Sequence, residues 1–173
     1  MEQRRYRGGR DNGGLIAAAA SVAAKALWKR LRAVQRLTFH AKSQLPTGWN
    51  GTGRGEVRVE PVGDAGLLFH ERGTYTPDGG KPMAFTNTFR WTAGADVDDR
   101  QLVRLEHLRF GADAPVFLFN LIPLTEELWE SARPHQCGED CYAARLRLAG
   151  DVVRADWTVS GPRKKEHIAY AYE

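Results

Sequence analysis

The sequence has only two cysteines, Cys137 and Cys141, and no apolar run of the roughly 18 residues that a membrane-spanning helix requires. Two cysteines exclude a disulfide-stapled scaffold, and the missing apolar run excludes an integral membrane protein. Internal repeats and heptads are also missing. What remains is a chain of 173 residues, 42% hydrophobic and 27% charged, which is typical of one globular domain rather than of a disordered chain.

An excess of one charge sign is missing from most of the chain. The formal net charge is +4, but residues 1–32 hold 8 of the 25 Lys and Arg and 2 of the 21 Asp and Glu, which leaves 17 basic and 19 acidic residues in 33–173. A nucleic-acid-binding domain should carry a basic face on the fold itself, so we expect no nucleic-acid partner. No secretory signal is evident, and we expect a cytoplasmic protein. The Arg-rich, acid-poor start leaves mitochondrial targeting as an alternative.

The chain divides into three predicted parts: a disordered basic arm over 1–14, a helix over 15–32 and a β-barrel domain over 33–173. The helix is predicted because Ala, Leu, Lys and Arg are strong helix formers and neither Pro nor Gly interrupts them. Its apolar residues follow helical spacing and form a face that could cover a barrel mouth. This face comprises Leu15, Ala19, Val22, Leu27 and Leu31.

Beyond residue 33, short segments alternate apolar and polar residues and are separated by Gly, Pro, Asn and Asp turns, which is typical of strands. The predicted strands are 35–43, 53–62, 65–75, 84–93, 100–110, 115–121, 140–148, 151–160 and 165–173. A meander of this length avoids exposed edges by closing, so the predicted fold is all-β, an antiparallel barrel of eight to ten strands. Residues 122–139 are the exception, with a predicted helical turn or irregular flap.

Side chains of a strand alternate between its two faces, so parity predicts which residues face inward. Several apolar faces also carry ionisable residues, namely Glu71, His107, Arg109, Asp140 and Tyr142. A packed core rarely holds so many unpaired charges, because burying each one costs on the order of several kcal/mol. A barrel around a cavity tolerates them. A bulge could instead place individual members, such as Glu71 or Arg109, at the rim.

Three constellations carry candidate chemistry. His135, Cys137, Cys141 and Asp140 match only half of the ligand pattern of a zinc site. Burial of the two cysteines as small apolar side chains is therefore favoured, and we expect no metal. A disulfide between the two cysteines would require a turn over 137–141. The second constellation is an acid–base group of His107, His135, Asp140 and Tyr142, weighed against a hydrogen-bonded network that ties the flap to the barrel.

The third constellation is an anion site formed by Arg109, Arg163 and Lys164. A guanidinium can hold a carboxylate or phosphate through two parallel hydrogen bonds. The alternative for residues 163–165 is a solvated turn, which is favoured for both lysines.

Two motifs point to a family. The run 135–142, HQCGEDCY, and the run 157–164, WTVSGPRK, follow Glu71-Arg72-Gly73. Together they resemble the patterns H-x-C-x-x-D-x-Y and W-x-V-x-G-P-R-K of a functionally uncharacterised family of lipocalin-like (calycin) domains from bacteria and fungi, over about residues 27–173. The resemblance implies a barrel with a ligand cavity and supplies no reaction. The family's G-x-W at the first strand is replaced here by Ala33-Val34-Gln35, so Trp28 or a different closure is expected at that end.

The leading functional hypothesis is binding of a small, largely apolar molecule with an acidic or polar group inside the barrel, without a cofactor. The predicted walls are Phe69, Phe85, Phe89, Trp91, Trp157 and Tyr170, and the predicted polar contacts are Glu71, His107, Arg109, Tyr142 and Arg163. The first alternative is a cofactor-independent isomerase, cyclase or lyase that uses the acid–base group in the same cavity. The second is an interaction module whose basic helix reaches an acidic partner or membrane surface. A homo-oligomer is compatible with all three hypotheses.

Overall fold

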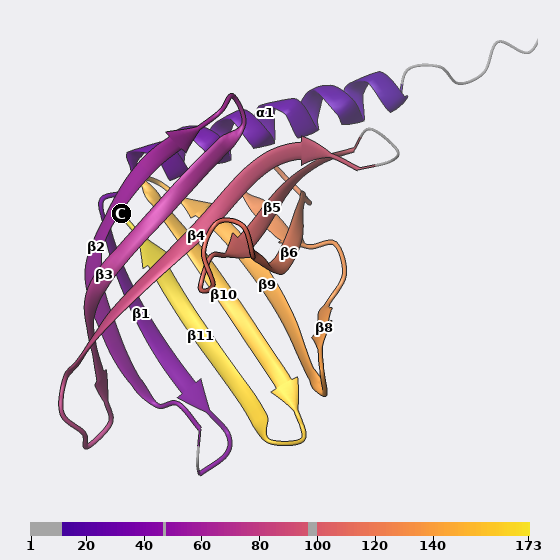
Figure 1. Ribbon diagram of the computed structural model, residues 1–173. Helices are drawn as coiled ribbons and strands as arrows, with labels where there is room; N and C mark the ends of the chain where they lie inside the picture. The colour runs from indigo at the N-terminus through magenta and orange to yellow at the C-terminus, as the bar shows by residue number, and fades with distance from the viewer. Residues whose placement is uncertain (1–11, 47, 97–99) are drawn as a thin grey trace, which may run out of the picture.

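A computed structural model describes residues 12–46, 48–96 and 100–173 of the protein, with side chains from Val22 onward (Figure 1). It contains one helix, α1 (Asn12–Ala33), followed by eleven strands. The strands are β1 (Arg36–Ser43), β2 (Gly51–Val62), β3 (Gly66–Pro77), β4 (Met83–Ala95), β5 (Gln101–His107), β6 (Val116–Pro123), β7 (Leu128–Ser131), β8 (His135–Cys137), β9 (Asp140–Ala149), β10 (Val152–Gly161) and β11 (Lys164–Tyr172). Most of the predicted arm, over residues 1–11, lies outside the described residues.

The strands form a closed antiparallel barrel, which confirms the predicted fold class. Each strand from β1 to β7 pairs with the next, β7 pairs with β9, and β9 pairs with β10. The ring then returns through β11 to β1, and β8 extends it only as a short partner of β9. The ring therefore contains ten strands. It is closed where β7 pairs with β6 on one side and with β9 on the other, so no sheet edge is free there.

Helix α1 lies across one end of the barrel (Figure 1) and contacts β2, β5, β6 and β10. Ala23, Leu27 and Leu31 are at most 1% exposed. These residues are spaced at i, i+4 and i+8, so they form one stripe that seals this end of the core. The predicted stripe is correct at Leu27 and Leu31 but wrong at Val22, which is 47% exposed because it lies one position off the stripe. Leu15 and Ala19 have no described side chains.

The prediction of a helical turn or flap over 122–139 is wrong. The hydroxyl of Thr125 accepts hydrogen bonds from the backbone N–H groups of Glu127 and Leu128, which makes a tight turn of the segment that was expected to be helical. The chain then forms β7 and β8. These strands are four and three residues long, too short for alternation of side chains to reveal them in the sequence.

Strand β5 ends at His107, three residues before the predicted strand end, and a bulge disturbs its pairing with β6. Leu105 lies opposite Phe119, whereas Glu106 lies opposite Phe117, so Leu118 is the extra residue. Arg109 therefore falls in the turn after β5 and is exposed. Its predicted position on the inner face is wrong.

Two glycines lie opposite each other at a close approach of β2 and β3. A Cβ on Gly55 would lie 2.5 Å from the backbone oxygen of Arg72, and a Cβ on Gly73 would lie 2.2 Å from that of Arg54. Only glycine permits this approach, and glycines at such points let a sheet bend as it closes into a barrel.

Candidate functional site in the open half of the barrel

The barrel interior has a sealed half and an open half. In the half beneath α1, the inward side chains are almost completely buried, among them Leu67, Leu121 and Trp129, each 0% exposed. At the other end the strands run into hairpins, and no element among the described residues covers them (Figure 1). In this half six inward side chains are half-buried, so solvent reaches them from the open end; they are Phe39, Phe85, Asn87, His107, Trp157 and Tyr170. Ala41, Tyr75 and Val159 on the same inner faces are buried.

A buried carboxyl group lies where the two halves meet. Glu71 on β3 is 2% exposed, and it accepts hydrogen bonds from the Tyr172 hydroxyl at 2.9 Å and from Nδ2 of Asn87 at 3.2 Å. Burial raises the pKa of Glu71 to about 7, although both hydrogen bonds act in the opposite direction. The carboxyl group therefore changes between neutral and ionised forms near neutral pH. Its inward position confirms the parity prediction for β3.

Aromatic rings line the open half in continuous contact. Tyr170 stacks on Tyr172 with ring centroids 5.6 Å apart, and it also contacts Phe39 at 5.1 Å and Trp157 at 5.4 Å. Trp157 in turn meets Phe89 edge-on at 5.8 Å. Burial raises the pKa of Tyr170, and the charge of Glu71 adds to the effect, so this phenol stays neutral.

His107 lies on the inner face of β5, as predicted, but away from the other proposed acid–base residues. Its ring stacks on Phe89 with centroids 4.7 Å apart. Burial lowers the pKa of His107, and the nearby charge of Arg109 lowers it further. The imidazole is therefore neutral around neutral pH.

A second polar cluster lies at the rim, where two hairpins meet. Lys164 at the start of β11 forms an ion pair with Asp140 at 2.6 Å and donates to the Tyr142 hydroxyl at 3.2 Å. These contacts raise the pKa of Lys164, the hydrogen bond to Asp140 first and the one to Tyr142 second. Lys164 therefore borders the turn that was favoured for it, but it lies at the start of β11 and is paired.

His135 does not join Asp140. Its ring lies 5.1 Å from Phe117 and 6.5 Å from Tyr142, measured between centroids. Within the described part of the chain, no hydrogen bond joins Asp140 to His107 or His135. The four residues of the predicted acid–base group are thus spread over β5, β8 and β9, with the carboxylate neutralised by Lys164.

The predicted anion site is not assembled either. Arg163 is exposed in the turn between β10 and β11, and Arg109 is exposed after β5 with its guanidinium 4.8 Å from the Phe110 ring centroid. Two of the predicted wall residues, Phe69 and Trp91, are 0% and 2% exposed and belong to the sealed half. The open half is lined by Phe85, Trp157 and Tyr170, together with Phe89 at its inner boundary.

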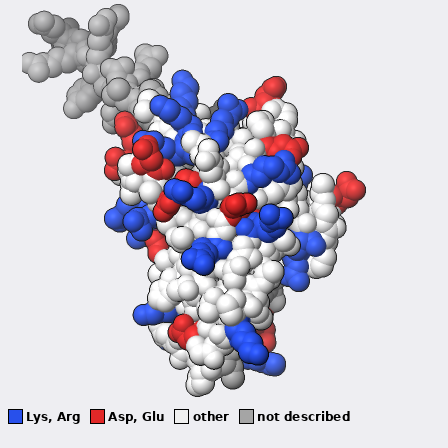
Figure 2. All heavy atoms as spheres, turned by 90° about the vertical axis from the view of Figure 1, so that its left-hand side faces the viewer, with Lys and Arg blue, Asp and Glu red and all other residues white. Residues whose placement is uncertain are grey.

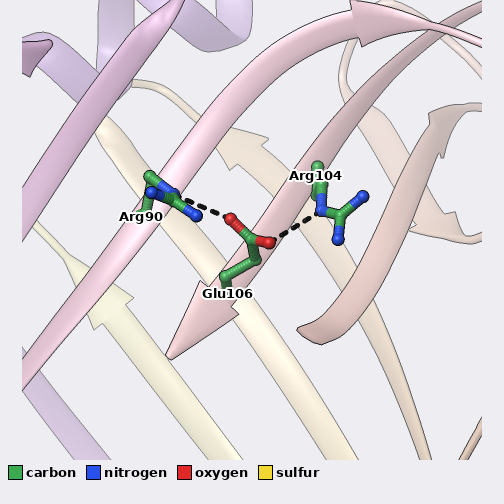
Figure 3. A network of polar contacts seen from close by, with 3 residues as sticks. All are labelled: Arg90, Arg104 and Glu106. Atoms are coloured by element: carbon green, nitrogen blue, oxygen red, sulfur yellow. Dashed lines mark hydrogen bonds and ion pairs between the residues drawn. The ribbon is translucent and has the colours of Figure 1, made fainter. Parts of the chain in front are cut away.

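Sequence analysis missed one buried charge, on the outer face of the barrel. Glu106 is 4% exposed and accepts hydrogen bonds from Nε of Arg90 at 2.8 Å and Nε of Arg104 at 2.9 Å (Figure 3). The Arg104 guanidinium also lies over the Phe117 ring, 5.0 Å from its centroid. Parity places Glu106 outward correctly. Arg90 lies directly opposite it on β4 and Arg104 is two residues earlier on the same face of β5, while the bulge places Phe117 opposite the carboxylate.

The two cysteines do not form a ligand set. Gly138 adopts a positive φ of 61° in a two-residue turn, so Cys137 lies opposite Asp140 and Cys141 lies opposite Gln136. Neighbouring residues on a strand face opposite sides, which separates Cys137 from Cys141, and both thiols are free. No group of three or more His, Cys, Asp or Glu in the described ranges could hold a metal ion.

Two hollows lie on the outer wall rather than inside the barrel. One, of about 760 Å³, is bounded by residues 132–136 and by Phe117, Asn120 and Ile122. The other, of about 720 Å³, lies mostly over the outer faces of β1, β2 and β11, where it includes His40 and Arg54, and it also borders Phe39 and Tyr170. Neither includes Glu71, Asn87 or Tyr172, so the buried acid belongs to the interior alone.

The outer wall carries charges of both signs. On the face shown in Figure 2, basic and acidic side chains are interspersed. An ion pair on β2, between Arg58 and Glu60 at 2.8 Å, also joins charges of opposite sign. A continuous basic stripe of the kind that tracks a nucleic-acid backbone is not seen on this face. In the described residues, no helix is both long enough and apolar enough to cross a membrane.

Comparisons with known proteins give few matches. No curated protein matches the chain. A solved structure of a redesigned beta barrel, mFAP1, bound to DFHBI is 12% identical, with a TM-score of 0.36, and the match covers 83% of this chain and 97% of that chain. A family profile matches residues 26–173. The chain therefore belongs to that family, a family of unknown function (DUF6314).

Proposed function

We propose that the protein binds a small, largely apolar molecule in the open half of the barrel, with the polar group of that molecule directed toward Glu71, Asn87 and Tyr172. The observation that carries the proposal is the position of Glu71. It is a buried carboxyl group whose partner Asn87 is half-buried and borders the solvent-accessible side. Buried polar groups at the boundary of an apolar hollow are the usual means of orienting a ligand.

The proposed wall residues are Phe85, Phe89, Trp157 and Tyr170, which project inward from β4, β10 and β11. Exposed apolar side chains stand at the open end and offer a path for an apolar molecule. Trp49, Met83 and Phe110 are 61%, 53% and 67% exposed. Exposed apolar groups around a hollow are typical of ligand-binding grooves.

Kinship to the lipocalin-like (calycin) barrels is a further part of the proposal. Its support is the meander order of the strands, in which almost every strand pairs with its sequence neighbour, as in up-and-down barrels. The ten-membered ring and the short partner strand β8 distinguish this barrel from an eight-stranded one.

The test is binding of a neutral aromatic probe, 1-naphthalenemethanol, measured by isothermal titration calorimetry. Ile168 is half-buried and faces inward on β11, so Ile168→Trp fills the open half and should weaken binding by at least about tenfold. The matched control, Lys165→Trp, places the same side chain on the exposed outer face of the same strand and should leave binding unchanged.

Equal affinity of the native chain and Ile168→Trp would contradict the proposal. Val159→Phe, which adds bulk from β10 on the same inner face, provides a second blocking variant and keeps the test decisive should Ile168→Trp fail to fold.

A further inference from the structure

Sequence analysis predicts an acidic or polar group on the ligand. The ionisable groups of the barrel interior are not placed to bind an acidic group. The two arginines that would hold an acid, Arg109 and Arg163, are exposed in turns. Lys164 is at the rim and is already paired with Asp140. The ionisable group at the inner limit of the open half is the carboxyl of Glu71, which has two hydrogen-bond donors and no cation within ion-pair distance among the described residues.

Asn87 lies between the Glu71 carboxyl group and the open half, and its amide can present a second acceptor there. Its Nδ2 donates to Glu71, and its Oδ1 takes part in no hydrogen bond within the described chain. A carboxylate only accepts hydrogen bonds, so ionised Glu71 holds the amide nitrogen toward itself and leaves the amide oxygen for a ligand. The polar floor therefore offers an acceptor backed by negative charge.

The rings around this floor suit a cation equally well. Tyr170, Trp157 and Phe39 form a contiguous group, with Phe85 5.6 Å from Phe39 between centroids. The faces of aromatic rings attract positively charged nitrogen, more strongly when water is excluded. An unpaired carboxylate and several aromatic faces together favour an ammonium group over a carboxylate or a carbonyl.

We propose that the bound molecule carries a protonated amine, which is recognised by Oδ1 of Asn87, by the charge of Glu71 behind it and by the faces of Tyr170, Trp157 and Phe39. This inference rests on the proposed function and names its ligand class. Binding of the amine and ionisation of Glu71 favour each other, because each stabilises the charge of the other.

The groups that face Glu71 set the pH dependence of binding. Tyr170 and Tyr172 from β11 stay neutral, because the pKa values of both phenols are raised by burial. His107 from β5 has a lowered pKa and gains charge only in acid, while Asp140 and Lys164 at the rim neutralise each other. Between about pH 8 and about pH 5.5, Glu71 gains a proton, which weakens the binding of a cation, and protonation of His107 in more acidic solution acts in the same direction.

The experiment compares three probes of one shape on the full chain by calorimetry: 1-naphthylmethylamine, 1-naphthalenemethanol and 1-naphthoate. At about pH 8 the amine should bind about tenfold more tightly than the alcohol, and the naphthoate should bind most weakly. The advantage of the amine should shrink at about pH 5.5. In Glu71→Gln the ratio of the amine affinity to the alcohol affinity should be lower than in the native chain at about pH 8, and it should no longer change between about pH 8 and about pH 5.5.

Each outcome separates the two proposals. Binding of the alcohol or the naphthoate at least as tight as that of the amine, at about pH 8, would overturn the amine inference and leave the proposed function standing. Binding of none of the three probes would overturn both. If Glu71→Gln does not fold, the loss of the advantage of the amine in acid provides the test on the native chain alone.

Discussion

Glu71 is the residue at which stability and ligand binding compete. The pKa of its carboxyl group is raised from 4.5 to about 7 in the folded protein, so the folded state binds this proton more tightly than the unfolded state does. The free energy of unfolding must then fall as pH rises from 4.5 to 7, and the group contributes no further change above that range. The full loss is about 3 kcal/mol, because one pKa unit corresponds to about 1.4 kcal/mol.

Glu71→Gln should remove this part of the pH dependence. The amide keeps an acceptor for Tyr172 but cannot ionise, so the variant should be more stable than the native chain at about pH 8 by up to about 3 kcal/mol. Urea unfolding at about pH 5 and about pH 8 measures the difference. Glu56→Gln, at an exposed position on β2, is the control and should not alter the slope. An unchanged pH dependence in Glu71→Gln would contradict the assignment.

Glu106 offers a second test at the residue scale. Its carboxylate is 4% exposed and is held by two arginines, one at each oxygen (Figure 3), so Glu106→Gln leaves one guanidinium group with a neutral acceptor and places an amide NH2 donor against the other. We expect a loss of about 1–3 kcal/mol in the free energy of unfolding, the range for charged hydrogen bonds. Glu60→Gln removes a carboxylate from a solvent-exposed ion pair, so its effect on the free energy of unfolding should be much smaller. Equal effects of the two variants would show that burial of Glu106 does not matter.

Helix α1 is the element that decides which end of the barrel is sealed. Leu27 is 0% exposed beneath it, so Leu27→Ala should cost about 2–5 kcal/mol in unfolding free energy, the range for a large-to-small change in a core. Val22→Ala on the exposed side of the same helix should cost less than about 0.5 kcal/mol. Thermal and urea unfolding measure both. A negligible effect of Leu27→Ala would mean that the helix is not part of the folded core.

Elements with long alternation could be predicted from the sequence, and short or bulged ones could not. The inward faces of β3, β10 and β11 follow from parity, and this places Glu71, Trp157 and Tyr170 correctly. Strands of three or four residues contain too few alternations to be recognised, so β7 and β8 were missed. The bulge at Leu118 and the early end of β5 change which face the following residues occupy. Both depend on local backbone geometry, which the alternation of apolar and polar residues does not reveal.

The pairing of Lys164 shows a different limit of sequence reading. Its partners Asp140 and Tyr142 lie on the far side of β10, more than twenty residues away in sequence. Their meeting depends on the register of two strand pairs, β9 with β10 and β10 with β11. Register between strands is set by turn geometry and packing together, so a motif such as G-P-R-K cannot reveal which of its cations points inward.

At the scale of the whole molecule, the barrel separates a sealed core from an open aromatic half, with Glu71 between them. The direct test is a crystal structure of the protein with 1-naphthylmethylamine. The probe should lie between Trp157 and Tyr170, with its nitrogen within hydrogen-bond distance of Oδ1 of Asn87. The account would be contradicted if density for the probe appeared only in the outer hollow bounded by residues 132–136, and if the inward side chains of the open half left no room for the probe.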